Sequence, residues 1–280
     1  MVTVPEVYLF DQEQHVILMD DAGEGSMSLQ AFVQQGRATT DMAKEIGSAV
    51  GSFLAWLHEW GRGNEDASRA VRGNEWGKRM SAQVFYGNLK RVLVDTCKHY
   101  DPPVDVDERK MEVLENIVQE TTKAILAEDH QVNLLFNNKV NGFVQFVMGD
   151  FWPGNLVVAL DEHGELEQIS VLDWEMSKLG LAGIDVGQFS AELYLLKRCH
   201  EPVCGETATV MLEHFLQAYG PTDDELRRAA VHLGCHLVVI PSFTKKGDGQ
   251  ITRAVAAEGV EVVVEPEKAV VYQLRRRGRD

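Results

Sequence analysis

The sequence predicts an α+β fold with a mainly helical body and a small amount of β-structure. Apolar residues recur at every third or fourth position over several long stretches, which is the spacing of amphipathic helices. Short runs rich in Val, Ile, Leu and Tyr open the chain, and further short apolar segments bounded by turn residues lie near its middle. Such runs are typical of strands. Short strands together with a mainly helical body indicate an α+β arrangement.

The first β-structure is expected at the N-terminus. Residues 4–10 and 15–19 are apolar runs, and the polar stretch 11–14 separates them. Two such runs around a short polar turn predict a β-hairpin. A lone hairpin is only marginally stable in water, so it needs neighbours.

Three long helices follow from the apolar spacing and from capping signals. The first is expected over residues 38–61. The second follows Asp105-x-x-Glu108, and the third follows Thr222-x-x-Glu225. Each of these two patterns resembles a capping box, in which two residues satisfy free amide groups at a helix start.

Between the second and third helices lie three short apolar segments, at residues 142–147, 155–160 and 166–172. Pro-Gly and Asp-Glu-His-Gly turns separate them. We expect the last two segments to form a hairpin set into the helical body.

Composition narrows the possible partners. The 280 residues are 45% hydrophobic, enough for a sizeable core, and carry a formal charge of −16. Nucleic-acid phosphates need a basic face, so this charge disfavours a nucleic-acid partner. It suits a cationic or neutral small substrate, although acidity also serves solubility alone.

The expected location is the cytoplasm, without a membrane partner. No apolar run approaches the roughly 18 residues that cross a bilayer, and the N-terminus has polar or acidic residues where a signal peptide would be basic and then apolar.

The spacing of the cysteines does not suggest a set of disulfide pairs, which predicts reduced thiols. Oligomeric state is not predicted. The cysteines are Cys97, Cys199, Cys204 and Cys235.

The residues that carry chemistry are Asp150, Asn155 and Asp173. Phosphoryl transfer from ATP needs a carboxylate beside the attacking hydroxyl and oxygen ligands that hold Mg²⁺ against the phosphates. Asp150 and Asn155 share one tight loop, which supplies a base and one metal ligand. Asp173 ends the strand that returns from the hairpin and supplies the second ligand. The order of loop, hairpin and Asp is that of kinase catalytic and metal-binding loops.

These segments, residues 148–155 (MGDFWPGN) and 171–175 (VLDWE), resemble the motifs of the aminoglycoside phosphotransferase and choline kinase family. The family's catalytic loop reads His-Gly-Asp-x-x-x-x-Asn, and its metal loop reads Ile-Asp-Trp or Ile-Asp-Phe with Glu following. The resemblance implies a protein-kinase-like fold, with Asp150 as catalytic base and Asn155 and Asp173 as Mg²⁺ ligands. The implied reaction is transfer of phosphate from ATP to a hydroxyl of a small molecule.

Other segments resemble the family outside these motifs. Asp185 lies in a stretch similar to the one whose Asp braces the catalytic loop, and Leu57-His58 is similar to the Leu-His pair that ends the first large helix. Met148 replaces the first His of the catalytic motif, and we expect it to support the loop by packing.

The family's adenine-binding hinge resembles residues 16–23. The resemblance implies that backbone groups of Met19, Asp20 and Asp21 bind adenine. Residues 1–15 contain neither Gly nor Lys, whereas kinases grip ATP with a Gly-rich strand pair and a Lys.

We therefore expect two parts: residues 1–25 as a remnant of the N-lobe sheet with the hinge, and residues 26–280 as a helical C-lobe. The N-lobe is expected to be truncated or to have lost ordinary ATP binding. Two functions follow: an ATP- and Mg²⁺-dependent small-molecule kinase, or a catalytically weak or inactive kinase-like binding protein. Acceptor choice is expected to lie in residues 63–138.

Two tryptophans flank the predicted site. Trp152 and Trp174 could offer aromatic faces to an ammonium group of a cationic acceptor. Packing of both rings against the loop is the favoured interpretation.

Overall fold

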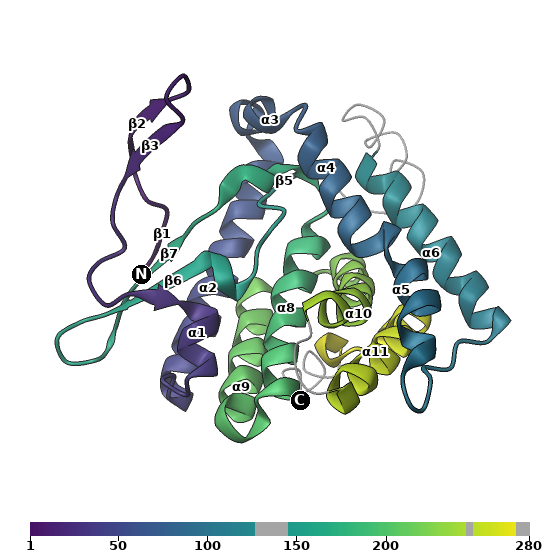
Figure 1. Cartoon of the computed structure of the whole chain (residues 1–280). Coiled ribbons are helices and arrows are strands. Elements are labelled where there is room, and N and C mark those ends of the chain that lie inside the picture. Colours follow the sequence, from purple (N-terminus) through teal and green to yellow (C-terminus); the bar gives the residue numbers. More distant parts are fainter. Residues whose placement is uncertain (127–144, 245–248, 273–280) are drawn as a thin grey trace.

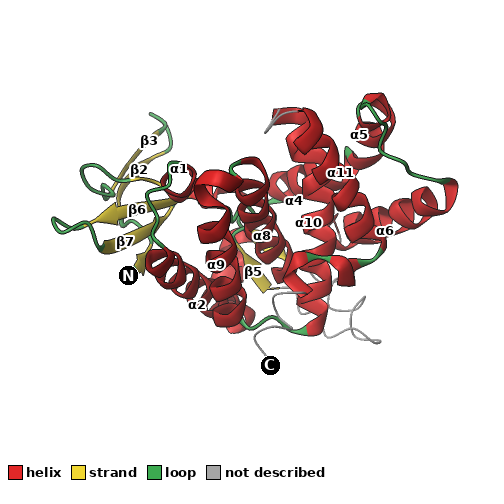
Figure 2. Cartoon of the chain, turned by 90° about the horizontal axis from the view of Figure 1, so that it is seen from below, coloured by secondary structure: helices red, strands yellow, loops and turns green. Residues whose placement is uncertain are grey.

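The computed structural model describes residues 1–126, 145–244 and 249–272. Most strands lie at one end of the molecule, and the helices α5 (Leu89–Asp95) and α6 (Glu108–Leu126) lie at the other (Figures 1 and 2). The expected α+β fold with a mainly helical body is confirmed.

The largest sheet has four strands in the order β1-β7-β6-β4. Strands β6 (Leu156–Leu160) and β7 (Leu166–Val171) form the hairpin that the sequence predicts. Strand β1 (Val2–Thr3) lies parallel to β7, and β4 (Met27–Ser28) lies antiparallel to β6. The first residues of the chain therefore join the sheet whose strand β7 leads into the predicted metal loop.

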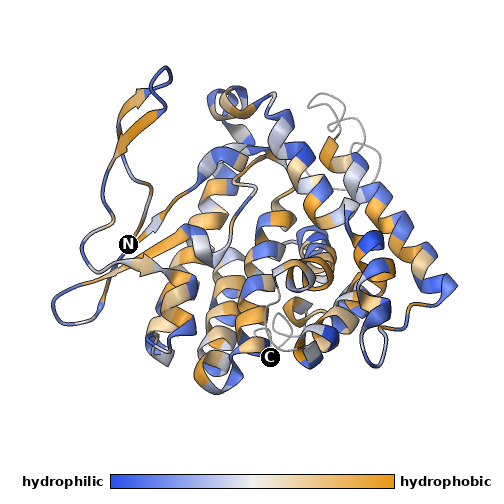
Figure 3. Cartoon of the chain, in the orientation of Figure 1, coloured by the Kyte–Doolittle hydropathy of each residue, from blue (hydrophilic) through white to orange (hydrophobic). Residues whose placement is uncertain are grey.

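The N-terminal hairpin is confirmed as β2 (Val7–Asp11) and β3 (Val16–Met19), which pair antiparallel. Consecutive residues of a strand point to opposite faces, yet the apolar residues of both strands are exposed. The hairpin thus stands apart from the core, and Figure 3 shows its apolar strands beside a hydrophilic turn.

A third, two-stranded sheet pairs β5 (Gln145–Val147) with β8 (Lys178–Gly180). Strand β5 is the described part of the expected segment 142–147, whose residues 142–144 lie outside the described residues. Strand β8 was not predicted from the sequence. This sheet matters because the predicted catalytic loop follows β5 directly.

The helices account for most of the described chain. They are α1 (Leu29–Gln34), α2 (Thr40–Gly63), α3 (Glu65–Val71), α4 (Glu75–Ser81), α5 (Leu89–Asp95), α6 (Glu108–Leu126), α8 (Ala182–Cys199), α9 (Glu201–Tyr219), α10 (Asp223–Thr244) and α11 (Gly249–Val264). Shorter helical turns are the π-helix η1 (Ala82–Gly87) and the 3₁₀ turns η2 (Cys97–His99), η3 (Pro153–Asn155), η4 (Trp174–Met176) and η5 (Pro266–Lys268).

The expected first long helix is α2, which packs closely on α9. Thr39 caps it by accepting a hydrogen bond from Met42 N at 3.2 Å. A methyl group added at Gly47 or Gly51 would collide with the α9 backbone, so these glycines permit the close approach. Helix α9 packs in turn on α8, whose residues from Ala182 to Leu193 are all buried. A helix buried on every side forms the centre of the core.

The two expected capping boxes have different outcomes. At α10, Thr222 Oγ1 accepts from Glu225 N at 3.2 Å and Glu225 Oε2 accepts from Thr222 N at 2.9 Å, so this capping box is confirmed. At α6 the cap is Asp107, whose Oδ1 accepts from Lys110 N at 2.7 Å. The expectation of Asp105 as the cap was wrong by two residues, because the acid nearer the first turn reaches the free amide.

None of the helices in the described ranges is both long and apolar enough to cross a membrane.

Candidate active site

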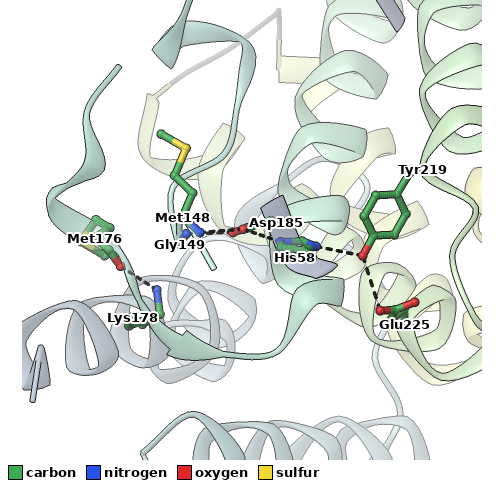
Figure 4. A network of polar contacts seen from close by, with 8 residues as sticks. All are labelled: His58, Met148, Gly149, Met176, Lys178, Asp185, Tyr219 and Glu225. Carbon is green, nitrogen blue, oxygen red and sulfur yellow. Dashed lines mark hydrogen bonds and ion pairs between the residues drawn. The ribbon is translucent and has the colours of Figure 1, made fainter. Parts of the chain in front are cut away.

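The loop that follows β5 is held in place by a buried carboxylate. Asp185 Oδ2 accepts from Met148 N and Asp185 Oδ1 accepts from Gly149 N, both at 2.9 Å (Figure 4). Asp185 is fully buried in the first turns of α8. Its two oxygens therefore fix the backbone immediately before Asp150.

The Asp150 carboxylate is itself held by two amide side chains. Gln188 Nε2 donates to Oδ1 at 2.5 Å, and Asn155 Nδ2 donates to Oδ2 at 3.0 Å. Asn155 Nδ2 also donates to the Asp150 carbonyl at 3.0 Å, which closes the loop on itself. Both carboxylate oxygens thus have fixed directions.

Burial raises the pKa of Asp150, because desolvation disfavours the charged form. The hydrogen bonds from Gln188 and Asn155 oppose this rise, and the negative charges of Asp173 and Asp185 add to it. Asp150 and Asp173 are therefore close enough to repel each other.

Asp173 sits in a strained position next to the loop. It has left-handed backbone angles, with φ of 66° and ψ of 61°, at the start of η4. Leu172 N donates to Asn155 O at 2.9 Å, so the end of β7 is tied to the predicted catalytic loop. Such backbone conformations in residues other than glycine are costly and concentrate at functional sites.

A further carboxylate joins this group. The pKa of Glu175 is raised, first by a hydrogen bond to Asp173 and by the Asp173 charge, and in smaller part by the Asp150 charge. The structure thus brings the three predicted residues together: Asn155 contacts Asp150, and the Asp173 charge acts on Asp150. Their roles as base and metal ligands stay predictions.

The carboxylates suit a cation that also has other ligands. Within the described ranges, no three His, Cys, Asp or Glu side chains are grouped so as to hold a metal ion by themselves. Mg²⁺ is commonly held by one or two protein carboxylates, with phosphates and water completing its six ligands. The side chains of Asn155 and Asp173 fit such a shared site. The carboxylates of Asp150 and Glu175 lie near Asp173 and are repelled by its charge, and a bound cation would offset this repulsion.

Behind the loop lies a buried polar chain that the sequence analysis identified only in part. His58 Nε2 lies 3.1 Å from Asp185 Oδ2, and His58 Nδ1 lies 2.9 Å from the Tyr219 hydroxyl. Tyr219 in turn donates to Glu225 Oε1 at 3.5 Å, in the α10 capping box (Figure 4). This chain links the start of α10 to the loop through α9, α2 and α8.

Met148 is fully buried within the main core. Its backbone amide is bonded to Asp185, so the loop is braced through the backbone, which any residue type can supply. Whether this support matters to a reaction stays a prediction.

The predicted hinge residues have partners inside the N-terminal hairpin. Asp20 N donates to Glu6 O at 3.0 Å, and Asp20 Oδ2 accepts from Glu6 N at 2.9 Å. The Tyr8 hydroxyl also donates to Asp20, and this bond lowers the pKa of Asp20. Asp21 accepts from Gly23 N at 3.2 Å in the following turn. Adenine binding by Met19, Asp20 and Asp21 stays a prediction.

The two tryptophans pack against the protein. Trp174 Nε1 donates to Val171 O at 3.0 Å, and its ring centroid lies 6.3 Å from that of Phe146. The Trp152 ring covers Gly154, where an added methyl group would collide with it. These contacts agree with the favoured interpretation.

Gln188 and Lys178 adjoin the loop and were not predicted from the sequence. Gln188 follows Asp185 by three residues on α8, and residues at this spacing share a helix face, so its contact with the same loop could have been found. Lys178 is a single lysine in the apolar strand β8, and its burial to 1% exposure was not predicted.

A braced Asp-containing loop beside a second Asp after a β-hairpin defines a candidate phosphotransferase site. The sequence model of the phosphotransferase enzyme family matches residues 1–231, and the chain belongs to this family. The expected family membership is therefore confirmed.

Curated relatives include two fungal proteins named 4-hydroxytryptamine kinase. The one from Psilocybe cyanescens is 26% identical over 93% of this chain and 66% of its own length. The one from Psilocybe cubensis is 26% identical over 88% of this chain and 62% of its own length. The chain thus spans just under two thirds of these relatives. A solved glucosamine kinase is similar with a TM-score of 0.45 and 14% identity, covering 99% of this chain and 68% of that chain.

Proposed function

We propose that this protein is an ATP- and Mg²⁺-dependent phosphotransferase that phosphorylates a hydroxyl group of a small molecule. The observation that carries the proposal is the Asp150 carboxylate, which the Asn155 and Gln188 amides orient on a loop braced by Asp185. A general base must be fixed within hydrogen-bond reach of the proton that it removes. Asp150 meets the requirement for a fixed position.

In this proposal, Asp150 accepts the proton of the attacking acceptor hydroxyl. Asn155 and Asp173 are the Mg²⁺ ligands, and the ion, when bound, neutralises charge on the transferred phosphate. The raised pKa of Asp150 makes it a better proton acceptor than an ordinary, fully solvated Asp.

The proposed acceptor is a small hydroxylated molecule, and we favour an amine because the protein carries a charge of −16. The names of two relatives specify 4-hydroxytryptamine, whose ring carries a hydroxyl and whose side chain carries an amine. This compound is therefore the first acceptor to test.

The test is a transfer assay with Mg²⁺-ATP that follows the phosphorylated product by ³¹P NMR. We expect product with 4-hydroxytryptamine or another hydroxylated amine, and none with tryptamine, which lacks the hydroxyl. Omission of Mg²⁺ should abolish transfer. Absence of product with a broad panel of hydroxylated small molecules would contradict the proposed function and favour a binding protein.

A further inference from the structure

A buried lysine lies between the loop that carries Asp150 and the segment that follows Asp173. Lys178 is 1% exposed, and Met176 O, at 3.2 Å, is the one hydrogen-bond acceptor of its ammonium group among the described residues. Burying an ammonium group is costly unless nearby charges compensate for the lost water. The position of Lys178 therefore needs a physical reason.

The ammonium group of Lys178 packs closely against Gly149. This glycine has a φ of 81°, and a methyl group built on it would collide with Lys178 Nζ and Met176 O. The ammonium group thus rests directly against the backbone that precedes Asp150. On its other side it binds the carbonyl of Met176, which ends the short helical turn after Asp173. Figure 4 shows Lys178 and Met176 beside the Met148-Gly149 backbone.

The negative charges of nearby carboxylates favour a cation at the position of Lys178. Asp150 and Asp185 attract it, while Lys78 repels it. Asp150, Asp173 and Asp185 are like charges that disfavour their own close approach. A cation between the segments offsets this repulsion.

We propose that Lys178 is a positioning residue, whose buried ammonium group holds the Asp150 loop against the segment that carries Asp173. This inference rests on the proposed phosphoryl transfer, since it concerns the geometry of that site. Lys178 acts through Gly149 and Met176, and it does not touch the phosphates.

Burial lowers the pKa of Lys178 to about 8, with Asp185 and Asp150 opposing the fall and Lys78 adding to it. His232 faces Lys178 as a buried neutral group, because its own pKa lies well below the usual value. Lys178 is therefore mainly charged at pH 7 and loses its charge as the pH rises through about 8.

The first test needs no activity. In protein labelled with ¹³C at lysine Cε, the signal absent from Lys178→Met should titrate with a midpoint of about 8. Asp150→Asn should lower this midpoint by removing an attracting charge, and Lys78→Met should raise it by removing a repelling one. A midpoint near the ordinary lysine value of ~10.4, unmoved by Asp150→Asn, would overturn the proposal.

The second test is kinetic and uses two buried lysines as a matched pair. Lys178→Met should lower kcat by ~10²-fold, the usual effect of a displaced catalytic group, with little change in KM. Wild-type kcat should fall above about pH 8 while Lys178→Met shows no such fall. Lys78→Met, which is 2% exposed before substitution, should retain kcat.

The outcomes separate this proposal from the proposed function. Wild-type kcat in Lys178→Met, with activity lost in Asp150→Asn, would overturn only the role of Lys178. A raised KM for ATP with kcat retained would instead indicate direct phosphate contact and also overturn it. An inactive wild-type protein would contradict the proposed function, and the lysine titration would still decide whether Lys178 senses Asp150.

Discussion

At the scale of single residues, the site depends on the hydrogen bonds to the Asp150 carboxylate and on the positive φ of Gly149. Both oxygens of Asp150 accept hydrogen bonds from neutral amides, which fix the carboxylate without neutralising it. Gln188 is itself buried on α8. Gly149 has a positive φ next to a buried cation, and no other residue type combines that freedom with that lack of volume.

Gly149→Ala should destabilise the protein more than Gly164→Ala. Both glycines have a φ of 81°, but a methyl group at Gly164 meets nothing within 4 Å, whereas one at Gly149 meets Lys178 and Met176. The control should cost about 1 kcal/mol for the backbone conformation alone, and Gly149→Ala about 1–3 kcal/mol more from the clash. Urea denaturation measures both values, and equal losses would contradict the described packing.

At the scale of elements, helix α10 carries both a capping box and buried polar residues, and its first turn is linked by hydrogen bonds to the Asp150 loop. Its first turn carries the Thr222–Glu225 capping box, and Glu225 also accepts from Tyr219 in the chain that leads to Asp185. Further along, His232 is fully buried and its Nδ1 lies 2.8 Å from the Tyr86 hydroxyl. The helix therefore contributes both a cap and buried polar contacts, which can be tested separately.

Thr222→Ala should lower the free energy of unfolding by about 1 kcal/mol, because the Glu225 amide loses its acceptor. Thr222→Ser keeps the hydroxyl and should lie within about 0.5 kcal/mol of the wild type. Thermal or urea unfolding measures the difference. An equal loss in both variants would show that the methyl group, and not the cap, matters.

The burial of His232 should make the stability of the protein depend on pH. Burial holds its folded-state pKa well below 6.5, so the unfolded chain binds a proton that the folded protein does not. Stability should therefore fall as the pH drops below about 6.5. His232→Gln should reduce the slope by up to ~1.4 kcal/mol per pH unit. Exposed His163→Gln serves as the control and should leave the slope unchanged, and an unchanged slope in His232→Gln would contradict this account.

At the scale of the whole molecule, the sequence predicted the local elements better than their tertiary partners. The hairpins and the helices α2, α6 and α10 follow from apolar spacing, and Asp150, Asn155 and Asp173 follow from their order along the chain. The parallel pairing of β1 with β7 joins segments more than 100 residues apart, and Lys178 is buried against Gly149, which lies on a different segment of the chain. No local pattern encodes such contacts, so they could not be predicted.

We propose that Asp150 accepts the proton while Asn155 and Asp173 hold Mg²⁺. The most direct test measures turnover and, by calorimetry, Mg²⁺-dependent ATP affinity for Asp150→Asn and Asp173→Asn. Asp150→Asn should lower turnover by ~10²–10⁴-fold and leave the affinity near that of the wild type, because the loop keeps its shape without its base. Asp173→Asn should weaken Mg²⁺-ATP binding itself. Wild-type turnover in Asp150→Asn, or unchanged affinity in Asp173→Asn, would contradict this assignment.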